Sequence, residues 1–218
     1  MAPESRLLLF DFDGVVVDSY RAFFDAYTAA CRAIARPGLA DEQTFLGVFD
    51  SNMLTGLKRL GIEGPALARF IDTLKRELTP RMPSVRCFDG MLDLLAEAAR
   101  RHPTRILTSN LTALVTEYLQ SQGLAAIPPV LGVDVEPSKV AKIRLARAQE
   151  PALTACYIGD TAGDMLEGRE AGAIPVGVAW GWHEPRRLVE AGAERIAASP
   201  ADLLTIIAPG LAHDFFGV

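Results

Sequence analysis

Two aspartates stand one residue apart at the end of an apolar run near the start of the chain. The stretch RLLLFDFDGVVVDS, residues 6–19, contains Asp11 and Asp13. Like charges this close destabilise each other unless a cation or a shared proton compensates them. An acidic loop without any function would show the same two residues. The pair therefore indicates a reactive or cation-binding site only if other residues of suitable chemistry join it.

A second acidic pair, Asp160 and Asp164, occurs in the stretch CYIGDTAGDM. Residues four apart at a strand end and in the first turn of a helix can face one point, and Gly159 and Gly163 allow close backbone approach. Four carboxylates on one rim would repel one another without a cation, and oxygen-rich sites of this kind suit Mg²⁺. The alternative is an ordinary helix start, where the helix dipole favours acidic residues.

A hydroxyl and an amine complete the set of reactive residues. The stretch RILTSN leaves Thr108 and Ser109 at the end of a predicted strand. Lys139 occupies the first turn of a predicted helix, where a cation opposes the macrodipole unless it neutralises an anion. Lys142, on the same helix face, is the alternative. Carboxylates, a hydroxyl, a lysine and Mg²⁺ together suit phosphoryl transfer, in which a carboxylate attacks phosphorus and cations meet the charge on the oxygens.

Short apolar segments that alternate with helix-length segments must position these residues. The predicted strands are Leu7–Phe10, Arg105–Leu107, Val130–Val133, Cys156–Ile158 and Pro175–Val178. We expect Asn110 to cap a helix over 110–122 and Ser138 to cap one over 138–149. The alternation predicts an α/β fold with a doubly wound, mostly parallel, Rossmann-like sheet and helices on both faces. Ligands bind such sheets at the carboxyl ends of the strands, where the candidate residues fall.

The segment between the first two of these strands contains no convincing strand. Its helical patterns cover Tyr20–Ala35, Asp41–Gly47, Asp50–Leu60 and Pro65–Leu78. This is too much helix for a crossover, so we predict a small all-helical cap domain mounted on the carboxyl edge of the sheet. The expected division is a core domain of residues 1–18 and 84–218 and a cap domain of residues 19–83.

Composition excludes several classes of partner. The 218 residues carry a net charge of -5 and no basic run, so we expect no nucleic-acid partner. No apolar run approaches the roughly 20 residues that a membrane span needs. The start MAPESR leads straight into the first strand, which predicts no signal peptide. The scattered Cys31, Cys87 and Cys156 indicate a reduced, cytoplasmic protein without a disulfide framework or zinc site.

The ordered motifs resemble the haloacid dehalogenase (HAD) superfamily, specifically its phosphoglycolate-phosphatase-like branch with a helical cap inserted after strand 1. FDFDGVVVDS is similar to the first motif of that family, ILTSN to the second, Lys139 to the third and YIGDTAGDM to the fourth. The stretch GREAGAIPVGVAWGW also resembles this branch. Two departures are Val15, where threonine is commonest, and EPSKVAKIR in place of a Lys-Pro form, which leaves Lys139 and Lys142 both open as the third-motif lysine.

The resemblance implies a role for each matched residue. Asp11 is expected to be the nucleophile, and Asp13 the general acid that protonates the leaving oxygen and then the base that activates water. Thr108, Ser109 and Lys139 are expected to bind the phosphoryl oxygens.

The resemblance also implies the metal ligands. Asp160 is expected to bind Mg²⁺ together with Asp11 and the backbone carbonyl of Asp13, with Asp164 as a further ligand or as support. Dehalogenases lack the acid at position 13, so its presence favours phosphate chemistry. The implied function is a Mg²⁺-dependent phosphatase that hydrolyses a small phosphorylated metabolite through an aspartyl-phosphate intermediate, as a monomer or homodimer.

Two other functions remain open at this point. A phosphomutase of the same fold uses both aspartates, but that branch typically carries a histidine soon after the first motif, and none occurs between Asp13 and Asp89. A phospho-accepting receiver module also gathers carboxylates, Thr and Lys around Mg²⁺, with its acceptor at the third strand. Asp134 stands there, but the later acidic pair and the helical insertion do not fit a receiver.

Aromatic residues outside the motifs are expected to be structural. We expect Trp180 and Trp182 to pack under a helix rather than to border the active site. We expect Phe215 and Phe216 to pack on the body or at a dimer contact.

Overall fold

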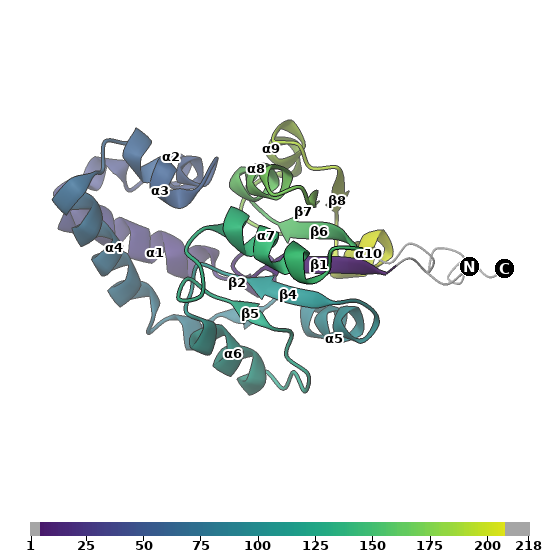
Figure 1. Cartoon of the computed structure of the whole chain (residues 1–218). Helices are drawn as coiled ribbons and strands as arrows, with labels where there is room; N and C mark the ends of the chain where they lie inside the picture. Colours follow the sequence, from purple (N-terminus) through teal and green to yellow (C-terminus); the bar gives the residue numbers. More distant parts are fainter. Residues whose placement is uncertain (1–4, 208–218) are drawn as a thin grey trace.

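Six strands form one parallel sheet at the centre of the protein (Figure 1). The computed structural model describes residues 5–207, so Phe215 and Phe216 lie outside the described part. The sheet order is β5-β4-β1-β6-β7-β8. The strands are β1 (Arg6–Asp11), β4 (Thr104–Leu107), β5 (Val130–Leu131), β6 (Thr154–Gly159), β7 (Ile174–Val178) and β8 (Arg195–Ala197). The predicted α/β class is confirmed, and the five predicted strands are present. Strand β8 was not predicted, because its three residues form no apolar run.

Strand β1 holds the centre of the sheet, between β4 and β6. Phe10 is paired with Ile106 of β4 on one side and with Ile158 of β6 on the other. Leu8 and Phe10 face one hydrophobic core, and Leu7 and Leu9 face the other. A strand buried on both faces reads as a continuous apolar run, which is why β1 shows no polar alternation.

Helices cover both faces of the sheet. They are α5 (Met91–Arg101), α6 (Thr112–Ser121), α7 (Lys139–Gln149), α8 (Ala162–Glu170), α9 (Pro185–Glu190) and α10 (Pro200–Ile207). Buried residues of α5, α6 and α10 belong to the core that contains Phe10, whereas those of α7 belong to the core that contains Leu9. This arrangement confirms a doubly wound sheet.

The two predicted helix caps have different outcomes. Ser138 caps α7, since its side chain accepts a hydrogen bond from Ala141 N at 3.3 Å. The prediction that Asn110 caps α6 is wrong, because the helix begins at Thr112 with Leu111 before it. Asp134 supplies the missing acceptor from another segment, with its Oδ1 2.8 Å from Thr112 N. This frees the Asn110 side chain for another contact.

A helical insertion lies between two short strands, β2 (Val17–Asp18) and β3 (Arg86–Cys87), which pair antiparallel. Its helices are α1 (Tyr20–Ala33), α2 (Glu42–Val48), α3 (Met53–Arg59) and α4 (Gly64–Leu78), with 3-10 turns at Pro37–Leu39 and Met82–Ser84. Figure 1 shows these four helices together beyond the sheet, on the side toward which the strands run. The expected all-helical cap is therefore present, and its boundaries at residues 19 and 83 stay a prediction.

The loop after β7 holds the cap against the core. The Trp182 ring lies within 5.5 Å (between ring centroids) of Phe23, Phe45 and Phe49 from the cap. His183 accepts a hydrogen bond from Ala162 N at Nδ1 and lies 3.0 Å from Leu46 O through Nε2. These bonds require the neutral imidazole with Nε2 as the donor, in agreement with burial, which lowers the pKa of His183. Trp182 thus packs against other aromatic side chains as expected, and these belong to the cap.

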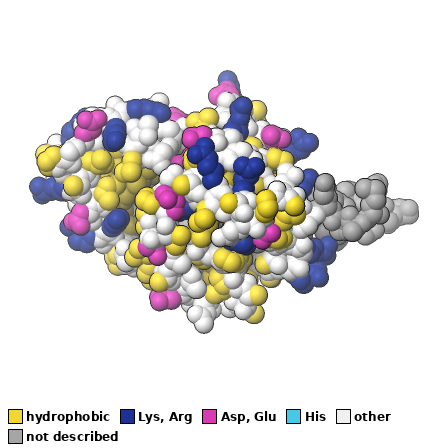
Figure 2. All heavy atoms as spheres, viewed as in Figure 1, with side chains coloured by type: hydrophobic (Ala, Val, Ile, Leu, Met, Phe, Trp, Pro, Cys, Tyr) yellow, Lys and Arg dark blue, Asp and Glu magenta, His cyan; other side chains and the backbone are white. Residues whose placement is uncertain are grey.

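The surface is mixed in charge. On the face that Figure 2 shows, Lys/Arg and Asp/Glu side chains are interspersed, with hydrophobic side chains between them. Within residues 5–207, no helix has both the length and the apolar character needed to cross a membrane.

Candidate active site

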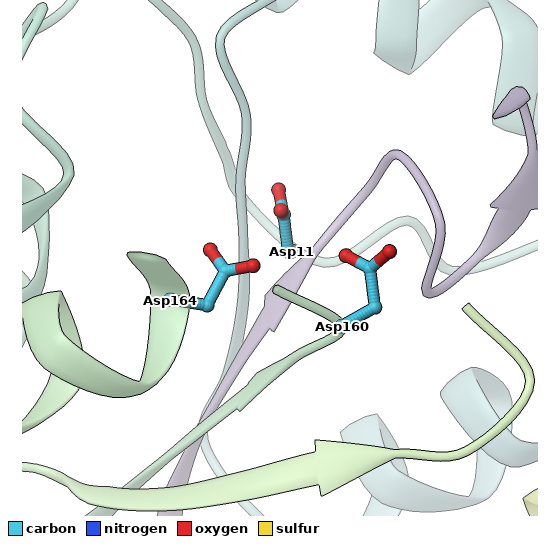
Figure 3. A group of neighbouring side chains, drawn as sticks. All are labelled: Asp11, Asp160 and Asp164. Carbon is cyan, nitrogen blue, oxygen red and sulfur yellow. The ribbon is translucent and has the colours of Figure 1, made fainter. Parts of the chain in front are cut away.

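Three carboxylates meet at the carboxyl ends of β1 and β6. Asp11 is the last residue of β1, Asp160 follows β6, and Asp164 lies in the first turn of α8. An oxygen from each lies within 4.8 Å of the others, and Figure 3 shows the three groups gathered around one point. All three residues are buried, with at most 6% of their surface exposed. The structure therefore brings Asp11 together with two acids that lie about 150 residues further along the chain.

Lys139 is the cation of this cluster. Its Nζ lies 2.6 Å from Asp11 Oδ2 and 2.7 Å from Asp164 Oδ1. Burial acts to lower the pKa of Lys139, but the charges of Asp11 and Asp164 outweigh it and hold the pKa well above its usual value. One ammonium facing three carboxylates leaves an excess of two negative charges when all the acids are ionised.

The pKa values of two of the acids are raised, as expected for buried carboxyl groups with too few cations beside them. Burial raises the pKa of Asp11 to about 8 although Lys139 opposes the shift. Burial, together with the charges of Asp164 and Asp11, holds the pKa of Asp160 well above its usual value. Carboxyl groups in this state become ionised when a cation binds beside them. The oxygen donors and their excess charge thus fit a divalent metal ion.

Asp164 is the acid of the three that already has many hydrogen-bond donors. Its Oδ1 accepts from Lys139 and from the Tyr157 hydroxyl at 2.8 Å, and its Oδ2 accepts from Thr161 N at 3.1 Å and Thr161 Oγ1 at 2.6 Å. Burial acts to raise the pKa of Asp164, but Lys139 and these donors outweigh it and lower the pKa. Asp160 accepts from Trp182 N at 2.8 Å. The loop that packs on the cap therefore also borders the site, and the expectation that Trp182 would not do so is wrong.

The two candidate lysines have separate contacts. Lys142 is fully buried and donates from Nζ to the backbone carbonyl of Thr108 at 2.6 Å. Burial, followed by the charge of Lys139, lowers the pKa of Lys142 to about 8. Thr108 is buried at the end of β4, whereas Ser109 beside it is exposed. The distances therefore favour Lys139 as the amine beside the carboxylates and assign Lys142 to supporting the Thr108 backbone.

Asp13 lies beside the cluster and has a partner that the sequence analysis missed. Asn110 donates from Nδ2 to Asp13 Oδ2 at 2.7 Å, and its backbone N–H donates to Thr108 Oγ1 at 3.0 Å. The Oδ1 atom of Asp13 is buried from solvent. Burial raises the pKa of Asp13 to about 6, against the Ser19 hydroxyl, the charge of Lys139 and the Asn110 amide. In the sequence, the position of Asn110 just after the predicted strand could have indicated this contact. The same position also suits a helix cap, which is how Asn110 was interpreted.

Two glycines allow the backbone to lie close to the site. Gly14 has a φ of +76°, and a Cβ there would lie 2.0 Å from Asp160 Oδ2. A Cβ on Gly163 would lie 2.7 Å from the carbonyl oxygen of Ser51, and its N–H donates to Phe49 O at 2.9 Å. The first glycine makes room for an acid of the cluster, and the second joins α8 to the cap.

The family comparison agrees with this geometry. The family described as haloacid dehalogenase-like hydrolase matches residues 8–178, which include all four motifs and the helical insertion. The chain belongs to this family and is a hydrolase. The resemblance expected from the motifs is therefore confirmed, and a receiver module is set aside because the match runs through the helical insertion.

Curated relatives cover nearly the whole chain. A phosphoglycolate phosphatase from Synechococcus elongatus is 29% identical over 207 residues, which are 93% of this chain and 97% of that protein. An N-acetylmuramic acid 6-phosphate phosphatase from Pseudomonas aeruginosa is 26% identical over 93% of this chain and 94% of that protein.

Solved structures show the same fold. A predicted phosphatase from Clostridium acetobutylicum has a TM-score of 0.78 at 20% identity and covers 94% of this chain and 98% of its own. A haloacid dehalogenase-like hydrolase from Streptococcus pneumoniae has a TM-score of 0.76 at 24% identity, over 93% and 98% of the two chains.

A Gly14→Ala variant tests the packing of Asp160. The added Cβ would displace the Asp160 carboxylate, and we expect turnover of p-nitrophenyl phosphate to fall by about 10²-fold, the scale of a 1 Å misplacement. Gly123→Ala is the matched control, because Gly123 has a similar φ of +84° and a Cβ there meets no atom within 4 Å. Steady-state rates of both variants measure the effect. Equal activity of the two would contradict the assigned role of this contact.

Proposed function

We propose that this chain is a Mg²⁺-dependent phosphatase that hydrolyses small phosphate monoesters through an aspartyl phosphate on Asp11. The observation that carries the proposal is that Asp11 and Asp13, two acids of one motif, have different hydrogen-bond partners. Asp11 belongs to the carboxylate cluster beside Lys139, whereas Asp13 is held by Asn110. A nucleophile and a separate proton carrier are the two groups that this reaction needs.

Asp11 is proposed as the nucleophile because both its oxygens are oriented. Oδ1 accepts from Phe12 N at 2.8 Å and Oδ2 accepts from Lys139. A carboxylate fixed in this way can be aligned with phosphorus before reaction. Lys139 and the hydroxyls of Thr108 and Ser109 are proposed to bind the phosphoryl oxygens, where negative charge must be met during transfer.

Asp13 is proposed as the general acid and then the base. Its raised pKa, about 6, allows it to carry a proton near neutral pH. Asn110 donates to Asp13 Oδ2 and so orients the carboxyl group that is proposed to give a proton to the leaving group and take one from the attacking water.

Mg²⁺ is the proposed cofactor, because small hard cations prefer oxygen ligands. Asp11 and Asp160, with the backbone carbonyl of Asp13, are proposed to hold it. When bound, the ion supplies positive charge that neutralises the phosphoryl oxygens. The many donors around Asp164 favour a supporting role, in which that carboxylate orients Lys139.

The relatives support a small phosphorylated metabolite as the substrate. Their names include phosphoglycolate phosphatase and N-acetylmuramic acid 6-phosphate phosphatase, so the branch acts on more than one ester. A cytoplasmic location and a monomeric or homodimeric state stay predictions from the sequence.

Separate roles for the two aspartates can be tested by intact-mass spectrometry. Asp11→Asn should form no phosphoenzyme, because the nucleophilic carboxylate is gone. Asp13→Asn keeps the nucleophile, so brief exposure to p-nitrophenyl phosphate, whose leaving group needs no proton, should let phosphorylated Asp11 accumulate. A phosphoryl adduct on the Asp11→Asn protein, or one mapped to Asp13 in the wild type, would contradict the assignment.

The two lysines can be separated by the same substitution. Lys139→Met should lower turnover by about 10²-fold or more, the scale of losing one preorganised donor. Lys142→Met should leave the Thr108 carbonyl unpaired and lower the free energy of unfolding by about 1–3 kcal/mol, with a smaller loss of turnover. Kinetics and urea unfolding of both variants measure these effects. If only Lys142→Met abolishes turnover, the third-motif lysine lies one helical turn further along.

A further inference from the structure

A cavity lies next to the proposed general acid, between α6 and the chain that returns from the cap. Its volume is about 190 Å³. The cavity is lined by residues from the start of the chain and from α6, and by residues of the returning chain. These are Phe12, Asn110, Leu114, Val115, Glu117, Tyr118 and Ser121, with Thr79, Met82 and Pro83. Phe12 precedes Asp13 in the chain, and Asn110 binds the Asp13 carboxylate at 2.7 Å. Asn110 thus lies between the cavity and the Asp13 carboxylate.

The hydroxyl groups around the cavity are used elsewhere. Thr79 Oγ1 donates to Lys75 O, Tyr118 Oη donates to Val85 O, and Ser121 Oγ donates to Tyr118 O, at 2.6–2.8 Å. The lining therefore offers mainly carbon surface, from Phe12 and the other apolar side chains to the Tyr118 ring. An apolar cavity of this kind binds apolar groups better than strongly hydrated ones.

The cavity also lacks a cation. None of its lining residues is lysine or arginine, and its one ionisable carboxylate, Glu117, is negative. Arg81 lies between two lining segments, but its guanidinium is bound to the backbone and side chain of Glu77. An anionic leaving group would enter without a partner and face Glu117, at a cost in free energy.

We propose that this cavity receives the leaving group of the substrate, and that the leaving group is uncharged and at least partly apolar. The inference rests on the proposed phosphatase function and narrows its substrate class. Phosphoglycolate, whose leaving group carries a carboxylate, is then a poor substrate, although relatives of this chain carry its name. The volume suits a group of modest size, since one water occupies about 30 Å³ in the liquid.

Two matched sets of esters test the proposal on the wild-type enzyme with Mg²⁺. 2-Phosphoglycolate and 2-hydroxyethyl phosphate differ by a carboxylate in place of a hydroxymethyl group, and kcat/KM should be higher for the hydroxyethyl ester. Ethyl, propyl and butyl phosphate form the second set. Their kcat/KM should rise by about four-fold for each methylene group that the cavity buries.

A charge placed in the cavity should change this selectivity. Leu114→Arg adds a cation to the lining and should raise the ratio of kcat/KM for 2-phosphoglycolate over 2-hydroxyethyl phosphate by about ten-fold. Gln120→Arg is the matched control, because Gln120 is exposed on the same helix and does not line the cavity. The control should keep the wild-type ratio. The wild-type series decides the question by itself if the Leu114 variant does not fold.

The possible failures are distinguishable. A wild-type preference for 2-phosphoglycolate over the hydroxyethyl ester, or equal kcat/KM along the alkyl series, overturns the cavity proposal and leaves the phosphatase function intact. An absence of Mg²⁺-dependent hydrolysis of every ester, p-nitrophenyl phosphate included, overturns the proposed function and this inference with it.

Discussion

The interaction on which the site depends is the contact of Lys139 with Asp11 and Asp164 at the end of the central strand. It compensates one of three buried negative charges and leaves two. Unpaired charges in a buried place are costly, so the cluster is stable as an ionised group only when a further cation joins it. The same imbalance makes the end of β1 a place where an anionic phosphoryl group and a divalent ion can be held together.

The sheet and the cap together bury the three carboxylates beside a single lysine, and so produce the excess of negative charge. A parallel sheet buries β1 on both faces and brings the ends of β1, β4 and β6 to one edge, where Asp11, Thr108 and Asp160 emerge. The cap covers that edge through the loop after β7, whose Trp182 touches both the cap aromatics and Asp160. Contacts between segments far apart in the chain therefore bury the excess negative charge. This burial is what makes the site suited to binding a cation.

The alternation of apolar and helix-length segments predicted the sheet and the helical insertion, and the positions of the acids at predicted strand ends and helix starts predicted that they meet at its edge. The sequence could not choose between Lys139 and Lys142, since both lie on one helix face and only packing shows which one reaches the acids. Asn110 was misread because the acceptor that caps its helix, Asp134, comes from a distant segment. The cavity beside Asp13 has no local signal, as its walls are far apart in the chain.

The central claim is that the ionised cluster lacks two positive charges. Calorimetric titration of the wild-type protein with Mg²⁺ at pH 7, in buffers of different ionisation enthalpy, measures both binding and coupled proton release. Because burial raises the pKa of Asp11 to about 8, and burial with the charges of Asp164 and Asp11 holds that of Asp160 well above its usual value, the cluster holds protons until a cation binds. The account predicts one bound Mg²⁺ per chain with release of at least one proton. Absence of binding, or binding without proton release, would contradict it.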